Sequence, residues 1–211
     1  PGPRRHRRSV NQAIALIAAY LLGSIPFAYL AGRLHGVDLR TVGSGNLGAT
    51  NVFRTLGRGV GITVMVLDIA KGAAAVLVAV ALTHTPWPLV AGALAILGHV
   101  FPVWTNFKGG KGVAVGAGAL IGLVPAASGV LIVLWFVIVL TTRYVSIASI
   151  VCAIAAAPLA WAFGAPWSYV VFIALAGLFV IWKHRENIVR LSRGEENRIS
   201  LGQRKGAARD G

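Results

Sequence analysis

Residues 60–82 read VGITVMVLDIAKGAAAVLVAVAL, and this stretch decides the fold. Asp68 and Lys71 are its only charged residues, and a helix needs about 20 apolar residues to cross a bilayer. Comparable apolar runs lie on both sides of it, at 12–30, 88–104, 145–163 and 168–182. The sequence therefore predicts an all-α, polytopic membrane helix bundle.

Composition places the whole chain in the membrane class. Of its 211 residues, 56% are hydrophobic and 12% are charged, and the mean hydropathy is +0.75. This length accommodates one compact bundle, so we expect a single domain over 1–211, with a basic extension at 1–10 and a polar tail at 196–211. The single Cys152 excludes an intrachain disulfide.

The charge distribution predicts the orientation in the membrane. The formal net charge is +14, and the basic residues gather at the ends of apolar runs. The connections 33–58, 105–111 and 183–211 carry Lys and Arg, whereas 83–87 and 164–167 carry none. By the positive-inside rule the first three are cytoplasmic and the last two external. Basic residues spread in this way, without interleaved aromatics, do not indicate a nucleic-acid partner.

The number of spans follows from the same alternation. The stretch 113–141 is long for one span and short for two, yet an odd number of spans must connect Lys111 to Gly164. We expect three: a short or re-entrant span at 113–123, a second at 126–140, and a third at 145–163. The total is about seven, with the N-terminus external and the C-terminus cytoplasmic. The basic cluster Arg4–Arg8 favours the opposite orientation.

Three polar islands interrupt the apolar sequence: Gly43–Asn51 (GSGNLGATN), Phe107–Gly112 (FKGGKG) and His184–Arg190 (HRENIVR). Glycine allows the backbone to point successive N–H groups at one place, which makes an anion cradle. Arg54 follows the first island, and its planar guanidinium suits phosphate. On the predicted topology all three islands face the cytoplasm, where they can form one phosphate-handling site.

The longer sequences GSGNLGATNVFR, GHVFPVWTNFKGGKGVA and HRENIVRLSRGEE resemble the three signature motifs of the PlsY family of membrane glycerol-3-phosphate acyltransferases. The resemblance extends from Gly23 to Glu195. It implies a bacterial, seven-helix protein of the plasma (inner) membrane with its active site towards the cytoplasm. The implied reaction transfers an acyl group from acyl phosphate to the 1-hydroxyl of glycerol 3-phosphate, giving lysophosphatidic acid and phosphate. It also implies functional coupling to an enzyme that produces acyl phosphate.

The resemblance assigns roles to residues of the three islands. The expected catalytic residues are Ser44, Arg54, Lys111 and His184, and the expected substrate-binding residues are Gly43, Gly45, Asn46, Thr50, Asn51, Lys108, Gly109, Gly110 and Asn187. Loop 43–51 should cradle the acyl phosphate, with Asn51 orienting it. Of Lys108 and Lys111, one should contact substrate phosphate and the other lipid headgroups. His184 and Asn187 should bind glycerol 3-phosphate.

Other polar residues are expected to act indirectly or structurally. Asp68 and Lys71 are three residues apart within an apolar run, and isolated charges are costly in a membrane. We expect a structural pair; the alternative is that Lys71 lends its charge to the site. His99 precedes the helix break at 101–102. It either supports the site from close by or is a hydrogen-bonded histidine buried in the helix bundle without a role at the site. Glu195 should pair with a neighbouring arginine, and Arg190 belongs to the same group.

The proton of the acceptor hydroxyl has two candidate destinations. His184 is tunable near neutral pH and is one candidate base. The substrate's own phosphate is the other, and we favour it. Acidic residues are too scarce for a carboxylate-bound magnesium site, so neither metal nor cofactor is expected.

Acyl-CoA-type acyltransferases carry an Asp five residues after a His, and that spacing is missing here. His35, His84, His99 and His184 are followed at that distance by Arg40, Leu89, Trp104 and Val189. Two other classes remain open: a transporter for an anionic solute, which would predict internal repeats that the sequence lacks, and a lipid-binding structural protein, which would not explain Arg54 beside a glycine cradle.

Overall fold

The computed structural model describes residues 3–200, and every regular element in that range is helical. The helices are α1 (Pro3–Ser24), α2 (Phe27–Leu34), α3 (Ala49–Thr55), α4 (Arg58–Leu82), α5 (Trp87–Val100), η1 (Val103–Thr105), α6 (Val113–Leu123), α7 (Pro125–Thr142), α8 (Val145–Ala162), α9 (Trp167–Lys183) and α10 (Arg185–Ser192). The all-α prediction is confirmed. Residues 1–2 of the predicted extension and 201–211 of the predicted tail lie outside the described residues.

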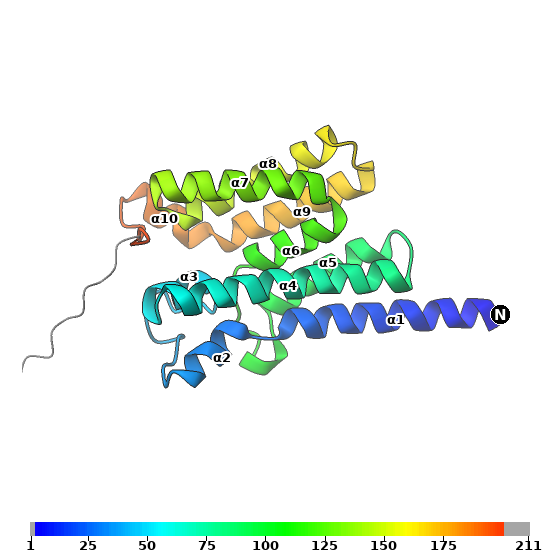
Figure 1. Cartoon of the computed structure of the whole chain (residues 1–211), viewed down its shortest axis with the longest axis horizontal. Helices are drawn as coiled ribbons and strands as arrows, with labels where there is room; N and C mark the ends of the chain where they lie inside the picture. Colours follow the sequence, from blue (N-terminus) through cyan, green and yellow to red (C-terminus); the bar gives the residue numbers. More distant parts are fainter. Residues whose placement is uncertain (1–2, 201–211) are drawn as a thin grey trace, which may run out of the picture.

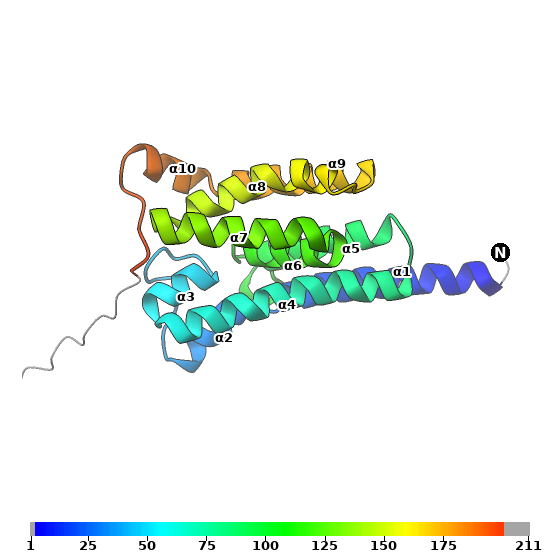
Figure 2. The same cartoon turned by 45° about the horizontal axis from the view of Figure 1, so that its top comes forward.

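The long helices run side by side in two groups (Figures 1 and 2). In the first group α4 packs against α1, α5 and α6, and α1 also packs against α5. In the second group α8 packs between α7 and α9. Helices α5 and α6 connect the groups through contacts with α9 and, for α6, with α7. The result is one helix bundle, as a single membrane domain requires.

Five helical segments of the described chain are long and apolar enough to cross a membrane. A sixth is obtained if α9 and α10, which meet at 56°, are counted as one bent span. Helix α6, at 11 residues, is too short to cross alone, as expected for 113–123. The polytopic bundle is confirmed, while the total of seven spans and the orientation of the termini stay predictions.

The apolar run 12–30 is not one continuous helix as predicted. Helix α1 ends at Ser24, and α2 begins at Phe27 after Pro26. Proline has no N–H to donate and disfavours helical backbone in the preceding residue, here Ile25. The carbonyl oxygen of Ile25 instead accepts a hydrogen bond from Lys71 Nζ of α4, at 2.7 Å. A buried lysine therefore compensates the break in the first span.

The close approach of α4 and α6 depends on glycine. A Cβ atom at Gly72 of α4 would collide with the backbone of Val115, and one at Gly118 of α6 with the backbone of Ile69. Small residues of this kind let membrane helices pack backbone to backbone, where van der Waals contact replaces the missing hydrophobic driving force. This packing places the start of α6, and Lys111 just before it, against the first helix group.

The polar islands lie at one end of the bundle. Helices α2, α3 and α10 cluster there, at the end opposite to the N-terminus, in both views (Figures 1 and 2). Hydrogen bonds join the islands across the chain, between Lys111 and Asn187 and between Arg54 and Asn197. The structure thus brings the second and third islands together, and it places Arg54, which follows the first island, beside the chain that follows the third.

Candidate active site

The first island is folded around Asn51, whose side chain is buried at the start of α3. Its Oδ1 accepts a hydrogen bond from the Ser44 amide at 2.9 Å, and its Nδ2 donates to the carbonyl oxygens of Leu39 and Val42, each at 3.1 Å. One carboxamide thus satisfies three backbone groups that the irregular loop leaves without partners. The expected orienting role of Asn51 is consistent with this geometry.

Gly43 is required by the same arrangement. Its φ of +63° lies in the left-handed region, and a Cβ atom there would collide with the Asn51 amide oxygen. Ser44 and Gly45 follow on the exposed side of the loop, and Asn46 and Thr50 are half-buried. The loop therefore presents small residues and backbone outward, around a rigid polar centre.

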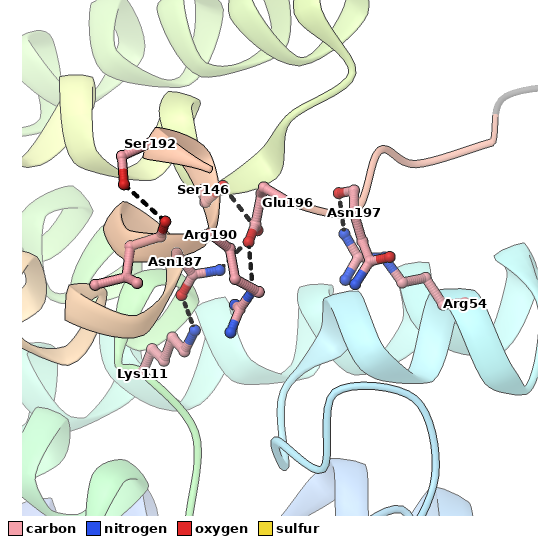
Figure 3. A network of polar contacts seen from close by, with 9 residues as sticks. Arg54, Lys111, Ser146, Asn187, Arg190, Ser192, Glu196 and Asn197 are labelled. Carbon is pink, nitrogen blue, oxygen red and sulfur yellow. Dashed lines mark hydrogen bonds and ion pairs between the residues drawn. The ribbon is translucent and has the colours of Figure 1, made fainter. Parts of the chain in front are cut away.

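Arg54 connects the first island to the chain after α10 (Figure 3). Its NH2 group donates to the carbonyl oxygen of Asn197 at 2.7 Å. Its Nε is buried without a hydrogen-bond partner in the described part of the chain. Burial lowers the pKa of this guanidinium, and the negative charge of Glu196 partly offsets that effect. A half-buried cation with an unpaired donor is suited to an oxyanion.

Lys111 and Asn187 connect the second and third islands. The Lys111 ammonium donates to the Asn187 carboxamide oxygen (Figure 3). Burial, and secondarily the positive charge of Arg190, lower the pKa of Lys111 to about 8. Lys108, three residues earlier, is exposed. The structure thus separates the two candidate lysines and places Lys111 inside the site.

Glu196 organises the third island, whereas the sequence predicted an ion pair between its neighbour Glu195 and an arginine. Its carboxylate accepts hydrogen bonds from Asn187 Nδ2 at 2.7 Å, Arg190 Nε at 2.7 Å and Ser146 Oγ at 3.0 Å (Figure 3). Burial alone would raise its pKa, but these three donors outweigh burial and lower it.

Glu195 is exposed instead, so the expected ion pair is found one residue further along the chain. Gly194, with φ +72°, reverses the chain after α10 and turns Glu196 inward. Ser146 was not predicted either, because nothing in its apolar surroundings in α8 indicates a partner 50 residues away.

His184 lies buried between α9 and α10. Its Nδ1 is 2.7 Å from the carbonyl oxygen of Val180, so this nitrogen carries a proton and donates it to that acceptor. Burial lowers the pKa of the imidazole, although the bond to Val180 opposes this effect. A neutral ring in this tautomer carries its lone pair on Nε2, the nitrogen that can accept a hydrogen bond.

The predicted intramembrane pair is present. Lys71 Nζ lies 2.7 Å from Asp68 Oδ1, and both side chains are buried in α4. His99 of α5 joins them, with its Nδ1 3.6 Å from the same oxygen. Gly109 and Gly110 of the second island donate their amide hydrogens to the carbonyl oxygens of Val100 and His99, each at 3.1 Å.

A family model described as glycerol-3-phosphate acyltransferase matches residues 13–194. The chain therefore belongs to the glycerol-3-phosphate acyltransferase family. Membership decides the class of protein: it is an acyltransferase of the membrane, rather than a transporter or a structural protein.

Named relatives agree with this family. A glycerol-3-phosphate acyltransferase of Rubrobacter xylanophilus is 44% identical over 190 residues, which cover 89% of this chain and 95% of the relative. One of Rhodopseudomonas palustris is 47% identical over 186 residues, covering 88% and 94%.

A solved structure of PlsY, an integral membrane glycerol 3-phosphate acyltransferase in its glycerol 3-phosphate form, superposes with a TM-score of 0.86 at 41% identity. It covers 90% of this chain and 96% of its own. A second PlsY structure, in the lysophosphatidic acid form, has a TM-score of 0.83 at 40% identity over 90% and 95% of the two chains. The family resemblance stated from the motifs is confirmed over nearly the whole chain.

Proposed function

We propose that this glycerol-3-phosphate acyltransferase takes its acyl group from acyl phosphate and transfers it to the 1-hydroxyl of glycerol 3-phosphate. The products are lysophosphatidic acid and inorganic phosphate. The observation that carries this proposal is the charge balance at the site. Arg54, Lys111 and Arg190 all act on a single carboxylate, Glu196. The surplus of positive charge suits two phosphorylated substrates bound together.

This acyl transfer needs positive charge to stabilise the leaving phosphate more than it needs a protein nucleophile. The hydroxyl oxygen of glycerol 3-phosphate attacks the acyl carbonyl carbon, and the bond from that carbon to the phosphate oxygen breaks. The electron pair leaves with the phosphate, whose growing charge is stabilised by the guanidinium of Arg54 and the backbone amides of loop 43–51. Lys111, Asn187 and His184 hold glycerol 3-phosphate on the facing side.

The hydroxyl proton is transferred to a phosphate oxygen of a substrate in this proposal. His184 then orients the acceptor through Nε2, since its Nδ1 is committed to Val180. A general base typically contributes about 100- to 10,000-fold to rate. A His184→Gln variant that loses less than about 100-fold in kcat supports the phosphate as acceptor. A loss of about 10,000-fold with substrate affinity unchanged makes His184 the base.

The setting that we propose is the bacterial plasma membrane, with the site on its cytoplasmic side. Glycerol 3-phosphate is a soluble dianion and reaches a basic site from the water phase, while the acyl chain of the donor stays in the lipid. Acyl phosphates hydrolyse readily, so an enzyme that forms them nearby would be a functional partner.

The deciding experiment compares acyl donors with purified protein in detergent. Palmitoyl phosphate and palmitoyl-CoA are offered separately, with and without glycerol 3-phosphate, and both phosphate release and lysophosphatidic acid are measured. We expect phosphate release that depends on glycerol 3-phosphate and matches the product in amount. Robust turnover with palmitoyl-CoA and none with palmitoyl phosphate would overturn the proposal.

A further inference from the structure

Three ionisable side chains lie inside the helix bundle beneath the second island. Asp68 and Lys71 of α4 and His99 of α5 are all buried, and His99 Nδ1 and Lys71 Nζ both face Asp68 Oδ1. Ionisable residues are costly within a membrane and are retained there for a purpose. A structural pair would need only Asp68 and Lys71, so the third member requires an explanation of its own.

Lys71 fixes this cluster to the first helix group. Its ammonium donates to the Ile25 carbonyl oxygen at the α1–α2 break, 2.7 Å away, and lies 5.4 Å from the centre of the Phe27 ring. Asp68 is held in turn by Lys71 at 2.7 Å. The position of Asp68 is therefore determined by Lys71, and the His99 ring lies beside that fixed carboxylate, with Nδ1 3.6 Å from Oδ1.

His99 contacts the glycine loop with both its backbone and its ring. Its carbonyl oxygen accepts the Gly110 amide hydrogen at 3.1 Å. A Cβ atom at Gly110 would collide with His99 Nε2 and lie 3.0 Å from the Leu47 carbonyl oxygen of the first island. The imidazole thus lies directly under Gly110, close to the place where the first two islands meet.

We propose that His99, which lies beside Asp68, is a positioning residue for acyl transfer: it fixes the course of Gly109 and Gly110 and thereby places Lys111 opposite Asn187. The peptide after Gly110 carries Lys111, so a shift of this glycine pair moves the ammonium directly. The inference rests on the proposed role of Lys111 at the substrates. A misplacement of about 1 Å at a reacting site costs on the order of 100-fold in rate.

The test uses two single variants and their combination. His99→Asn keeps a donor at the position of Nδ1, facing Asp68, but removes the ring edge beneath Gly110. Gly110→Ala introduces a methyl group that collides with that edge. In the double variant the shorter side chain removes the collision with the ring, while the Leu47 carbonyl oxygen stays 3.0 Å from the new Cβ, so the recovery should be partial. His35→Asn is the control, because His35 lies outside this cluster: its Nδ1 bonds the Ala31 carbonyl oxygen, and the residue is exposed.

We expect kcat/KM for glycerol 3-phosphate to fall at least tenfold in each single variant and to recover several-fold in the double variant relative to Gly110→Ala. The unfolding midpoint in detergent should stay close to that of the His35→Asn control. The high-pH limb of kcat/KM should also move upward, because Lys111 leaves its buried place near Arg190, Lys183, Glu186 and Glu196. A merely structural histidine would not move that limb.

Wild-type kcat/KM and an unchanged pH profile in His99→Asn would overturn the inference. So would a double variant no more active than Gly110→Ala. If His99→Asn does not fold, Gly110→Ala alone decides: its methyl group pushes against the His99 ring and should still move the pH limb, and an unchanged limb would count against the inference. The assay uses whichever acyl donor the wild-type protein turns over, and a Lys111→Ala variant measured alongside shows separately whether Lys111 matters at all.

Discussion

The ammonium group of Lys111 contacts the carboxamide of Asn187, although 76 residues separate them in the chain. This contact joins the second and third islands, and both residues also lie in the electrostatic field of Glu196. The two groups that we propose as binding a phosphorylated substrate are therefore positioned by each other before the substrate arrives. Such preorganisation is the main way in which a site with no protein nucleophile accelerates a reaction.

Lys111 should give the reaction a descending limb at high pH. Its pKa of about 8 means that the ammonium loses its proton as the pH rises through that value. The attraction for phosphate is lost with the proton, so kcat/KM for glycerol 3-phosphate should fall about tenfold per unit above pH 8. The measurement is a pH profile corrected for spontaneous hydrolysis of the donor.

The two lysines of the second island supply the comparison for this profile. Lys111→Arg should abolish the limb, since a guanidinium stays charged to above pH 12. Lys108→Arg should keep it, because Lys108 is exposed. A limb that persists in Lys111→Arg and disappears in Lys108→Arg would assign substrate binding to Lys108.

Glu196→Gln should destabilise the protein, whereas Glu195→Gln should not. The carboxylate of Glu196 has three donors, and the change leaves the Arg190 guanidinium without its anion. The expected cost is about 1–3 kcal/mol of unfolding free energy. Glu195→Gln, at an exposed position, should lower the unfolding free energy by less than about 0.5 kcal/mol. Unfolding in detergent, followed by circular dichroism, measures both.

The pH dependence of the unfolding free energy provides a second test of the contribution of Glu196. Its pKa is lower in the folded protein than the usual 4.5. Its contribution is therefore present above about pH 4.5 and is lost as the pH falls through the folded value. Wild-type protein should lose stability in that acidic window more steeply than Glu196→Gln. Identical slopes would show that the Arg190–Glu196 pair contributes nothing to stability.

Gly43→Ala should strongly lower the activity of the enzyme by distorting the first island. Gly36→Ala is the control for this change. Both glycines have a similar positive φ, +63° and +68°, so both substitutions introduce the same backbone strain. Only at Gly43 does the new methyl group collide with the Asn51 carboxamide, while the space around Gly36 is open. We expect a large loss of kcat/KM in Gly43→Ala alone. Equal activity would mean that the Asn51 anchor is not required.

Membrane orientation is tested by labelling single cysteines in a Cys152→Ala background. The charge distribution predicts that Lys108→Cys reacts with an impermeant maleimide only after the membrane is opened. Gly164→Cys, in the connection after α8, should react in intact cells. Labelling in the opposite pattern would invert the topology, and the basic cluster Arg4–Arg8 would then be cytoplasmic.

The apolar runs predicted the helices, because hydrocarbon solvation leaves a membrane segment few alternatives to a helix. Local chemistry also predicted the Asp68–Lys71 pair, whose members are one helical turn apart. The break at Pro26 was missed because its compensation comes from Lys71, 46 residues from Ile25. The ion pair with Arg190 belongs to Glu196 and not to the predicted Glu195. Helical periodicity stops at Gly194, so the sequence does not tell which of two adjacent carboxylates turns inward.

Arg54→Lys should lower kcat/KM strongly, although the substitution keeps the positive charge. The guanidinium uses NH2 to hold the Asn197 carbonyl oxygen and keeps a buried Nε without a partner in the described residues. A lysine ammonium cannot donate to the Asn197 carbonyl oxygen and at the same time replace the Nε donor, which points in another direction. Loss of a charged donor to a phosphate in a partly dry site should cost about 2–4 kcal/mol of transition-state binding. That corresponds to roughly 30- to 1000-fold in kcat/KM.

Arg58→Lys is the matched control for this change. Arg58 lies four residues further along, at the start of α4, is exposed, and donates to the Ser200 carbonyl oxygen at 3.5 Å. Both substitutions keep the charge and so leave the membrane orientation undisturbed. Arg58→Lys should alter kcat/KM by less than about threefold, as for a solvated surface residue whose contact is worth under 1 kcal/mol. If Arg54→Lys and Arg58→Lys are equally active and equally well folded, Arg54 only supplies charge at a helix end, and the phosphate must be held by Lys111 and the loop amides.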